Sequence, residues 1–326
     1  MKRENIVGRA NVEDTPELEA YYRELEGEAL GALWTVANEI EPWYPQPKSV
    51  PTLWKWQRVE RFVRRAPELV SAEKAARRVV MLVNPGRKEW SAAAGLLYTG
   101  VQVMNPGEFT SAHRHQASAL RFVMEGKGAY TVVDGERMRL GARDFVLTPN
   151  GTWHDHGVDA DGTQCTWQDG LDIPLMNSLD ANFYEVHPDL VQKPHPLSRE
   201  NWSKPYSPVF LYKWDDCYAI LKRDGAFEYT NPLTNGSVMP TMGAGLQLIK
   251  TPTARIRHTG SLIYQVASGS GWSEIGDRKF EWQEKDIFCV PSWTPYRHGA
   301  HGEAVLFSFH DLPAMKALSL YREARD

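Results

Sequence analysis

Three histidines form the part of this sequence whose residue types and spacing point most directly to chemistry. His113 and His115 are two residues apart, so in an extended strand both imidazoles leave the same face. His154 follows the turn sequence at 149–151 and can reach the same place from a later strand. Three neutral imidazoles on a rigid sheet bind a metal ion and leave coordination positions open. We therefore predict a metal site at these histidines, in preference to three unrelated surface or core histidines.

The composition indicates a soluble globular protein from a reducing compartment. The chain has 326 residues, of which 42% are hydrophobic and 24% charged. Its formal net charge of -4 provides no basic surface for nucleic acid or an anionic membrane, and neither a membrane helix nor a secretory signal is visible. Cys165, Cys217 and Cys289 are odd in number and widely spaced, which argues against a disulfide framework and a thiolate zinc site. We expect a cytoplasmic protein that binds neither nucleic acid nor membrane.

The sequence predicts a helical arm followed by two β-rich regions that a linker separates. Thr15, Pro16 and Glu17 are typical of a helix start, since they supply a cap, a proline in the first turn and an acid beside it. Short strands between glycine turns begin at Val79 and favour an antiparallel barrel or sandwich. The predicted boundaries are 1–80 for the arm, 81–186 for the first barrel, 187–240 for the linker and 241–326 for the second barrel.

The first β-rich region returns after the linker in a degraded form. The aligned pairs are His115 with His258, Arg121 with Tyr264, Asp144 with Asp286, Pro149 with Pro291 and His156 with His298. In this alignment Ile256 and Tyr296 occupy the places of His113 and His154. One imidazole of the three is too few for a tight site, so the second barrel is predicted to be structural and metal-free.

These motifs resemble those of the gentisate 1,2-dioxygenase family of bicupin ring-cleaving enzymes, which includes salicylate and 1-hydroxy-2-naphthoate dioxygenases. The pattern Gly-x5-His-x-His, then Pro-x-Gly-x2-His, is that of a cupin barrel, and residues 113–122, 153–157 and 169–174 carry the family resemblance. Ala119 stands where many cupins place a glutamate ligand, an absence typical of this subgroup, while Tyr98 replaces the tryptophan of many relatives. The resemblance implies an all-β bicupin, with two jelly-roll barrels and an N-terminal helical arm, that assembles as a homotetramer.

The resemblance and the strand alternation together predict the residues around the metal. Arg121 lies six residues after His115, an even offset that returns it to the inward face. It is predicted to hold a substrate carboxylate, with a structural ion pair as the alternative. His156 is predicted to contact substrate or dioxygen or to be a fourth ligand, and Asp169 to orient His156 or Arg121 unless it lies in a surface turn. The further substrate-binding candidates are Arg77, Arg78, Tyr98 and Gln102.

The predicted function is that of a ring-cleaving dioxygenase. The resemblance implies Fe(II), a substrate whose carboxylate and ortho hydroxyl chelate the metal, and dioxygen at the remaining position. The bond between C1 and C2 is expected to break in gentisate or another 5-substituted salicylate, such as 5-nitrosalicylate or a halosalicylate. The alternatives are a 1-hydroxy-2-naphthoate dioxygenase and a manganese or iron cupin of another class, whether an isomerase, a decarboxylase or a non-catalytic ligand-binding protein.

Overall fold

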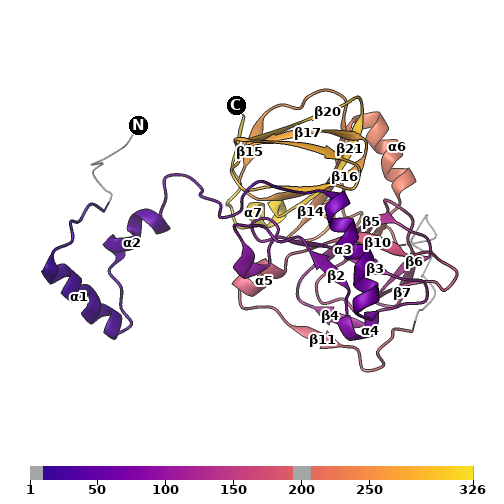
Figure 1. The fold of residues 1–326 in the computed structure, drawn as a ribbon, viewed down its shortest axis with the longest axis horizontal. Helices are drawn as coiled ribbons and strands as arrows, with labels where there is room; N and C mark the ends of the chain where they lie inside the picture. The colour runs from indigo at the N-terminus through magenta and orange to yellow at the C-terminus, as the bar shows by residue number, and fades with distance from the viewer. Residues whose placement is uncertain (1–9, 194–206, 326) are drawn as a thin grey trace. The chain divides into compact units, whose positions relative to one another are not determined.

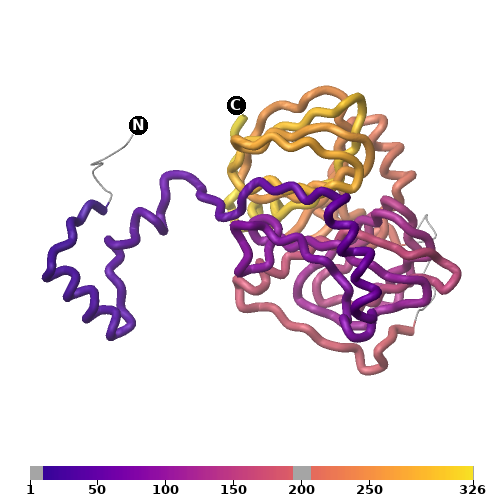
Figure 2. The backbone as a smooth tube through the Cα atoms, in the orientation of Figure 1, coloured from indigo at the N-terminus to yellow at the C-terminus, as the bar shows by residue number. Residues whose placement is uncertain are grey.

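The computed structural model describes residues 10–193 and 207–325, which divide into two compact units, Met1–Gln46 and Pro47–Asp326 (Figures 1 and 2). Unit 1 contains the helices α1 (Pro16–Gly27) and α2 (Leu33–Ile40). The predicted helix start is confirmed, because the Thr15 hydroxyl accepts a hydrogen bond from the Leu18 amide at 3.3 Å. Among the described residues, no helix combines the length and the apolar character that crossing a bilayer requires.

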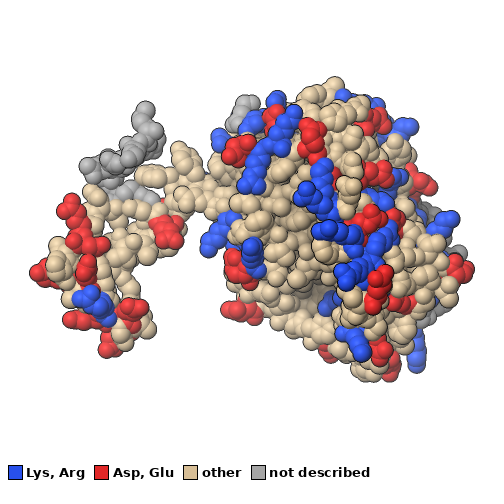
Figure 3. Space-filling model, in the orientation of Figure 1, with Lys and Arg blue, Asp and Glu red and all other residues tan. Residues whose placement is uncertain are grey.

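Unit 1 exposes apolar side chains that its own helices do not bury. The side chains more than half exposed include Leu30, Leu33, Ile40, Trp43 and Tyr44. Acidic side chains gather on the same unit, and Arg23 is the one basic residue within its described part (Figure 3). Apolar surface of this kind is typical of a segment that packs on another protein surface. The expected homo-oligomer stays a prediction.

Unit 2 contains two β-barrels, each built from one six-stranded and one five-stranded sheet, and the predicted all-β class is confirmed. The strands of barrel 1 are β2 (Val79–Met81), β3 (Tyr98–Met104), β4 (His113–His115), β5 (Ala119–Glu125), β6 (Ala129–Val133), β7 (Glu136–Arg139), β8 (Phe145–Thr148), β9 (His154–Val158), β10 (Cys165–Leu171), β11 (Tyr184–Val186) and β12 (Leu211–Tyr212). Its sheets have the orders β12-β8-β5-β10-β3-β2 and β11-β4-β9-β6-β7.

Barrel 2 repeats this plan. Its strands are β1 (Thr52–Trp54), β13 (Ala226–Glu228), β14 (Gly243–Ile249), β15 (Ile256–His258), β16 (Leu262–Ser268), β17 (Ser270–Ile275), β18 (Arg278–Gln283), β19 (Ile287–Val290), β20 (Tyr296–Ala300), β21 (Ala304–His310) and β22 (Glu323–Arg325). Its sheets have the orders β1-β19-β16-β21-β14-β13 and β18-β17-β20-β15-β22. The helices of unit 2 are α3 (Trp56–Leu69), α4 (Ala72–Ala75), α5 (Ile173–Ser178), α6 (Trp214–Asp224), α7 (Leu312–Ala317) and the 3-10 helix Lys88–Trp90.

The strand registers of the two barrels match the repeat that the sequence predicts. His113 on β4 lies opposite His154 on β9. Ile256 on β15 lies opposite Tyr296 on β20, at the same place in barrel 2. The predicted alignment is therefore confirmed at these positions. It extends to the six-stranded sheets, where the pair Arg121–Asp169 corresponds to the pair Tyr264–Ser308.

Each barrel takes one edge strand from the other half of the chain. β1 precedes barrel 1 in the sequence but pairs with β19 of barrel 2, and β12 follows barrel 1 in the sequence but pairs with β8 of that barrel. Figure 2 shows the segment that contains β1 running beside the orange strands. Unit 1 ends at Gln46, whereas the expected arm extends to residue 80 and so includes β1, which belongs to unit 2. The sequence gives no sign of this, because the strand that pairs with β1 is remote along the chain. The expected linker, 187–240, likewise contains β12, α6 and β13.

A buried aspartate in each barrel fixes the helix that follows the exchanged strand. Asp286 accepts a hydrogen bond from the Trp56 amide at the start of α3, at 2.7 Å, and its carboxylate pairs with Lys55 Nζ at 3.0 Å. An acceptor at this position satisfies a helix amide that has no partner within the helix. Barrel 1 repeats the arrangement at the start of α6 with Asp144, Lys213 and Trp214.

Strand alternation separates the barrel interiors from the interface between the barrels. Leu120 and Phe122 of β5 point outward, and the Phe122 ring stacks on Phe307 of barrel 2 with 4.1 Å between centroids. Arg121, between them in sequence, therefore faces the interior of barrel 1. The six-stranded sheet of barrel 1 thus packs on barrel 2 with one face and lines its own interior with the other.

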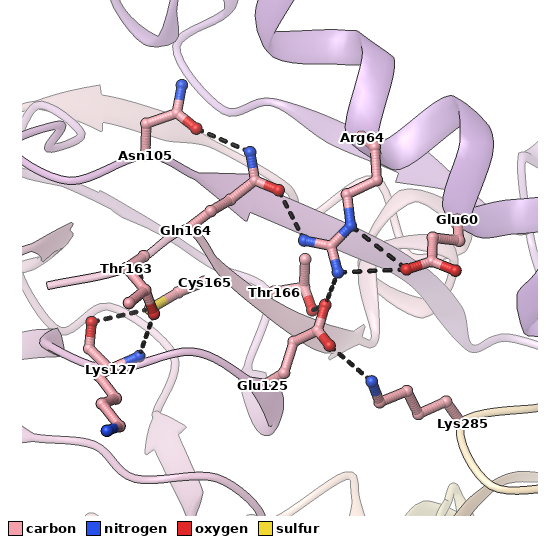
Figure 4. A network of polar contacts seen from close by, with 10 residues as sticks. All are labelled: Glu60, Arg64, Asn105, Glu125, Lys127, Thr163, Gln164, Cys165, Thr166 and Lys285. Carbon is pink, nitrogen blue, oxygen red and sulfur yellow. Dashed lines mark hydrogen bonds and ion pairs between the residues drawn. The ribbon is translucent and has the colours of Figure 1, made fainter.

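A polar network also joins the barrels (Figure 4). Glu125, the last residue of β5, pairs with Arg64 of α3 and with Lys285 of barrel 2. Arg64 donates a further hydrogen bond to Gln164 at 2.6 Å, and the Thr166 hydroxyl donates to Glu125 at 3.3 Å. The network therefore ties α3, β5 and barrel 2 together at one point.

Replacing Asp286 by alanine should lower the free energy of unfolding by about 1–3 kcal/mol, because the Trp56 amide loses its acceptor. Asp286→Asn keeps an acceptor oxygen and should cost less. Asp277→Ala removes an exposed turn aspartate of the same barrel and should change the free energy by less than about 0.5 kcal/mol. Urea unfolding followed by tryptophan fluorescence measures these differences. Equal losses for Asp286→Ala and Asp277→Ala would contradict the capping role.

Candidate metal centre and substrate pocket

The three predicted histidines meet on two neighbouring strands of barrel 1. His113 and His115 both lie on β4, and His154 lies opposite His113 on β9. The ring centroid of His154 is 4.3 Å from that of His113 and 4.7 Å from that of His115. Each histidine offers one ligand nitrogen, and these nitrogens all lie within 4.8 Å of one another. The arrangement fits one metal ion held by three imidazoles.

Main-chain carbonyls determine which nitrogen of each imidazole faces the centre. Each Nδ1 atom lies at hydrogen-bond distance from a main-chain oxygen. Because a carbonyl oxygen can only accept, Nδ1 carries the proton and Nε2 keeps its lone pair. The pairs are His113 with Ser111 at 2.7 Å, His115 with Ala117 at 2.7 Å and His154 with Thr152 at 2.9 Å. The Nε2 atoms of His115 and His154 are buried without a hydrogen-bond partner, which suits metal ligands.

Burial keeps these imidazoles in the neutral form that binds a metal. It lowers the pKa of His113 to about 3 and the pKa of His115 to about 4, and the charge of Arg77 adds to both shifts. Burial also holds the pKa of His154 well below its ordinary value, and the two neighbouring histidines act in the same direction. A neutral ring needs to lose no proton before it binds a metal ion.

The corresponding positions of barrel 2 have a different hydrogen-bond arrangement. The Nε2 atom of His258 lies 3.1 Å from the hydroxyl of Tyr296, and Ile256 offers no ligand atom. His298 contacts the Ser273 hydroxyl through Nδ1 at 2.7 Å. That the second barrel binds no metal stays a prediction.

A pocket of about 400 Å³ opens among β2, β3, β5 and β10 of barrel 1. Predicted site residues line much of it, namely Arg77, Tyr98, Gln102, Arg121 and Asp169, together with Ala75, Ala76, Val79, Met81, Leu171 and Ile173. Arg77 connects the pocket to the metal site, since its Nη1 atom is 3.2 Å from Nε2 of His113. The lone pair that accepts this hydrogen bond is the one a metal ion needs. Metal binding and this hydrogen bond therefore exclude each other.

Arg121 and Asp169 form a buried ion pair in the wall of this pocket. Arg121 Nε lies 3.1 Å from Asp169 Oδ1, although the two atoms are not aligned as a hydrogen bond. Burial lowers the pKa of Arg121 to about 10 against the attraction of Asp169, and raises the pKa of Asp169 to about 6 against the attraction of Arg121. Both groups are consequently charged at neutral pH. Arg121 Nη1 donates a hydrogen bond to the Thr148 hydroxyl at 3.1 Å.

His156 and Gln102 carry buried polar atoms without partners. His156 contacts the Thr131 hydroxyl through Nδ1 at 2.9 Å, while its Nε2 atom has no hydrogen bond. Burial and the charge of Arg121 hold the pKa of His156 well below its ordinary value. Both amide atoms of Gln102 are also unpaired and buried. Gln102 lines the pocket, so its unpaired atoms indicate where a ligand completes the hydrogen bonding.

Arg78, like His156, is a predicted substrate-binding residue that does not line the pocket. Its guanidinium pairs with Glu108 and donates to the main-chain carbonyls of Val70 and Val103, at 3.2 Å and 3.3 Å. Successive residues of an extended chain point to opposite sides, so Arg77 reaches the metal site while Arg78 forms an internal ion pair.

The whole chain also matches proteins of known activity. A model of the cupin domain matches residues 100–174. The chain is 36% identical to gentisate 1,2 dioxygenase 1 of Aquipseudomonas alcaligenes, over 96% of this chain and 97% of that protein. It is 34% identical to a 1-hydroxy-2-naphthoate 1,2-dioxygenase of Nocardioides sp. strain KP7, over 94% and 87% of the two chains. The solved structure of salicylate 1,2-dioxygenase from Pseudoaminobacter salicylatoxidans with gentisate has a TM-score of 0.90 at 32% identity and covers 100% and 98% of the chains.

The chain belongs to the gentisate 1,2-dioxygenase family. It is a bicupin and a ring-cleaving dioxygenase of the gentisate and salicylate 1,2-dioxygenase type, as the sequence motifs predicted. Its three imidazoles and its pocket are thus parts of one candidate site in barrel 1, and barrel 2 is the second cupin repeat.

Sequence reasoning misses two residues of this dioxygenase site. Tyr184 of β11 stacks on the His113 ring with 5.3 Å between centroids, and the Arg77 guanidinium lies 5.4 Å from the Tyr184 ring. β11 is short and its residues are exposed, so no periodic pattern reveals it. Thr148 is missed because a buried strand threonine usually indicates packing. The signal available for it is the repeat, since barrel 2 has Val290 at the same place.

Alanine in place of His113, His115 or His154 should each time remove most of the bound metal, because two imidazoles cannot complete the ligand set. His258→Ala is the matched control in barrel 2 and should leave the metal content unchanged. Elemental analysis after anaerobic loading with ferrous ion measures the content, with about one ion per chain expected in the unaltered protein. Two ions per chain would contradict a single site.

Proposed function

We propose that this enzyme uses Fe(II) and dioxygen to break the bond between C1 and C2 of gentisate or another 5-substituted salicylate. The observation that carries the proposal is the position of Arg77 between two features, since it lines the pocket and its guanidinium lies next to the three-histidine site. One feature is a neutral metal site without a carboxylate among its histidines. The other is a cationic pocket wall, which suits an anionic aromatic acid.

Fe(II) fits three imidazole ligands and, when bound, would supply open positions for the carboxylate and hydroxyl oxygens of the substrate and for dioxygen. The protein contributes orientation. Arg121, which pairs with Asp169 and lines the pocket, binds the substrate carboxylate, and Arg77 supplies a second positive charge. His156 brings a neutral imidazole whose unpaired Nε2 can form a hydrogen bond with the phenolic hydroxyl. Positioning of this kind lowers the entropic cost of the reaction.

Two residues of the pocket wall favour gentisate among these substrates. Burial raises the pKa of Tyr98, with the charge of Asp169 acting in the same direction, so its phenol stays protonated and can donate a hydrogen bond. Gln102 has both an unpaired donor and an unpaired acceptor. A 5-hydroxyl group can use such partners, whereas a 5-halogen cannot. 1-Hydroxy-2-naphthoate is the second candidate, because a similar protein acts on it, and family membership disfavours an isomerase, a decarboxylase or a non-catalytic cupin.

An oxygen-uptake screen tests the proposal. The enzyme is loaded anaerobically with Fe(II) and offered gentisate, salicylate, 5-nitrosalicylate and 1-hydroxy-2-naphthoate in air-saturated buffer. Gentisate should give the highest kcat/KM, with one dioxygen consumed per ring opened. The same enzyme loaded with Zn(II), which has no redox chemistry, is the control and should consume no oxygen. Uptake with none of the four acids would defeat the proposal.

Arg121→Lys should lower kcat/KM for gentisate at least roughly tenfold, because lysine keeps the charge but loses the planar fork that binds a carboxylate. Arg121→Ala should cost more, and the iron content should stay near that of the unaltered enzyme in both variants. Arg139→Lys is the matched control, since the Arg139 side chain is 83% exposed. Unchanged turnover in Arg121→Ala would show that another group holds the carboxylate, with Arg77 the nearest candidate.

A further inference from the structure

The guanidinium of Arg121 makes two side-chain contacts, one with Asp169, as expected from the sequence, and one with Thr148. Asp169 lies 3.1 Å from Nε, but the two atoms are not aligned as a hydrogen bond. An ion pair at a single atom fixes distance and leaves the planar group free to rotate. The second contact is the hydrogen bond from Nη1 to Thr148 Oγ1 at 3.1 Å. Two contacts at different nitrogens define the orientation of the plane.

The Thr148 hydroxyl can serve Arg121 only as an acceptor. A hydroxyl has one hydrogen, and Thr148 donates it to the main-chain carbonyl of Ala119 at 3.3 Å. A lone pair of the oxygen is therefore directed to Arg121. Both residues are at most 2% exposed, so water does not compete for this bond. Among the described contacts of Arg121, Nη2 makes no hydrogen bond and is the nitrogen left for the pocket that Arg121 lines.

In barrel 2, where no arginine occupies the place of Arg121, the strand that corresponds to β8 has a different residue at the place of Thr148. Thr148 lies opposite Ala119 at the end of β8, and Val290 lies opposite Leu262 at the same place in β19. The positions of Arg121 and Asp169 are taken in barrel 2 by Tyr264 and Ser308. The three positions of Arg121, Asp169 and Thr148 therefore all have different residues in barrel 2. Since threonine and valine have nearly the same shape, β8 does not need the hydroxyl for packing.

We propose that Thr148 is a positioning residue that fixes the plane of the Arg121 guanidinium, so that Nη2 faces the substrate carboxylate. The inference rests on the proposed function, in which Arg121 binds that carboxylate. Thr148 itself touches neither substrate nor metal in this role. It acts by preventing the rotation of the Arg121 guanidinium that the contact with Asp169 alone would permit. Supporting hydrogen bonds commonly orient binding and catalytic residues in this way.

The first test compares catalysis in conservative variants. Thr148→Val should lower kcat/KM for gentisate about tenfold, mainly through a higher KM, with iron content unchanged. Thr148→Ser keeps the hydroxyl and should recover activity to within about threefold of the unaltered enzyme. Thr166→Val is the matched control, because Thr166 is an equally buried strand threonine whose hydroxyl contacts Glu125. A kcat/KM in Thr148→Val equal to that of Thr166→Val would overturn the proposal.

The second test separates orientation of Arg121 from a general structural role. Affinities for 2-hydroxybenzoate and for the uncharged 2-hydroxybenzamide are measured by calorimetry on the iron-loaded enzyme without oxygen. Thr148→Val should weaken 2-hydroxybenzoate about tenfold and leave 2-hydroxybenzamide within about twofold, and it should add nothing when Arg121 is already alanine. Equal weakening of both ligands, or an additive loss in the double variant, would overturn the proposal.

Arg121→Ala distinguishes failure of this inference from failure of the proposed function. If Arg121→Ala weakens 2-hydroxybenzoate but Thr148→Val does not, Arg121 binds the carboxylate and Thr148 plays no part. If Arg121→Ala leaves the affinity for 2-hydroxybenzoate unchanged, the carboxylate is bound elsewhere, and the roles of both residues are refuted together.

Discussion

The hydrogen bonds from three imidazole Nδ1 atoms to main-chain carbonyls are the constraint on which the site depends. They fix the tautomer of His113, His115 and His154 and turn each Nε2 toward a common centre. The carbonyls belong to residues that lie two positions beyond the ends of β4 and β9, so the ligand geometry is a property of the backbone. The barrel provides that backbone, because β4 and β9 are paired at His113 and His154. Barrel closure and the clustering of the three imidazoles are therefore two consequences of one register.

The second repeat supports this register. β12 pairs with β8, the strand that ends at Thr148, and Leu211 lies opposite Val146 in that pair. On the other face of the sheet, Phe122 stacks on Phe307. Strand β5, which carries Arg121, is thus packed against barrel 2, and its neighbour β8 is bounded by a strand from the second half of the chain. Loss of barrel 2 would remove the rigid support of the substrate-binding wall.

The sequence was sufficient for the features that depend on local spacing. The two-residue offset of His113 and His115, and the repeat that places His258 on His115, needed only strand alternation and glycine turns to be recognised. Features that depend on distant partners were not accessible in the same way. β1 has three residues and pairs with β19, far along the chain, so its membership of unit 2 leaves no local pattern. Arg77 and Arg78 are adjacent and chemically alike, and only the contact of Arg78 with Glu108 separates their roles.

The alternation of inward and outward side chains explains how one barrel of the pair can lack a complete histidine set while the fold is kept. The outward residues of the six-stranded sheets pack between the barrels, whereas the ligands and pocket residues point inward. Isoleucine at the place of His113, as in Ile256, or tyrosine at the place of Arg121, as in Tyr264, changes the interior of one barrel and leaves the shared interface intact. The interface between the barrels therefore constrains the outward positions, and the chemistry of the site constrains the inward positions. Residues with a role in the reaction should accordingly be sought at inward positions that are polar in one barrel and apolar in the other. Thr148, which lies opposite Ala119 and corresponds to Val290, is at such a position.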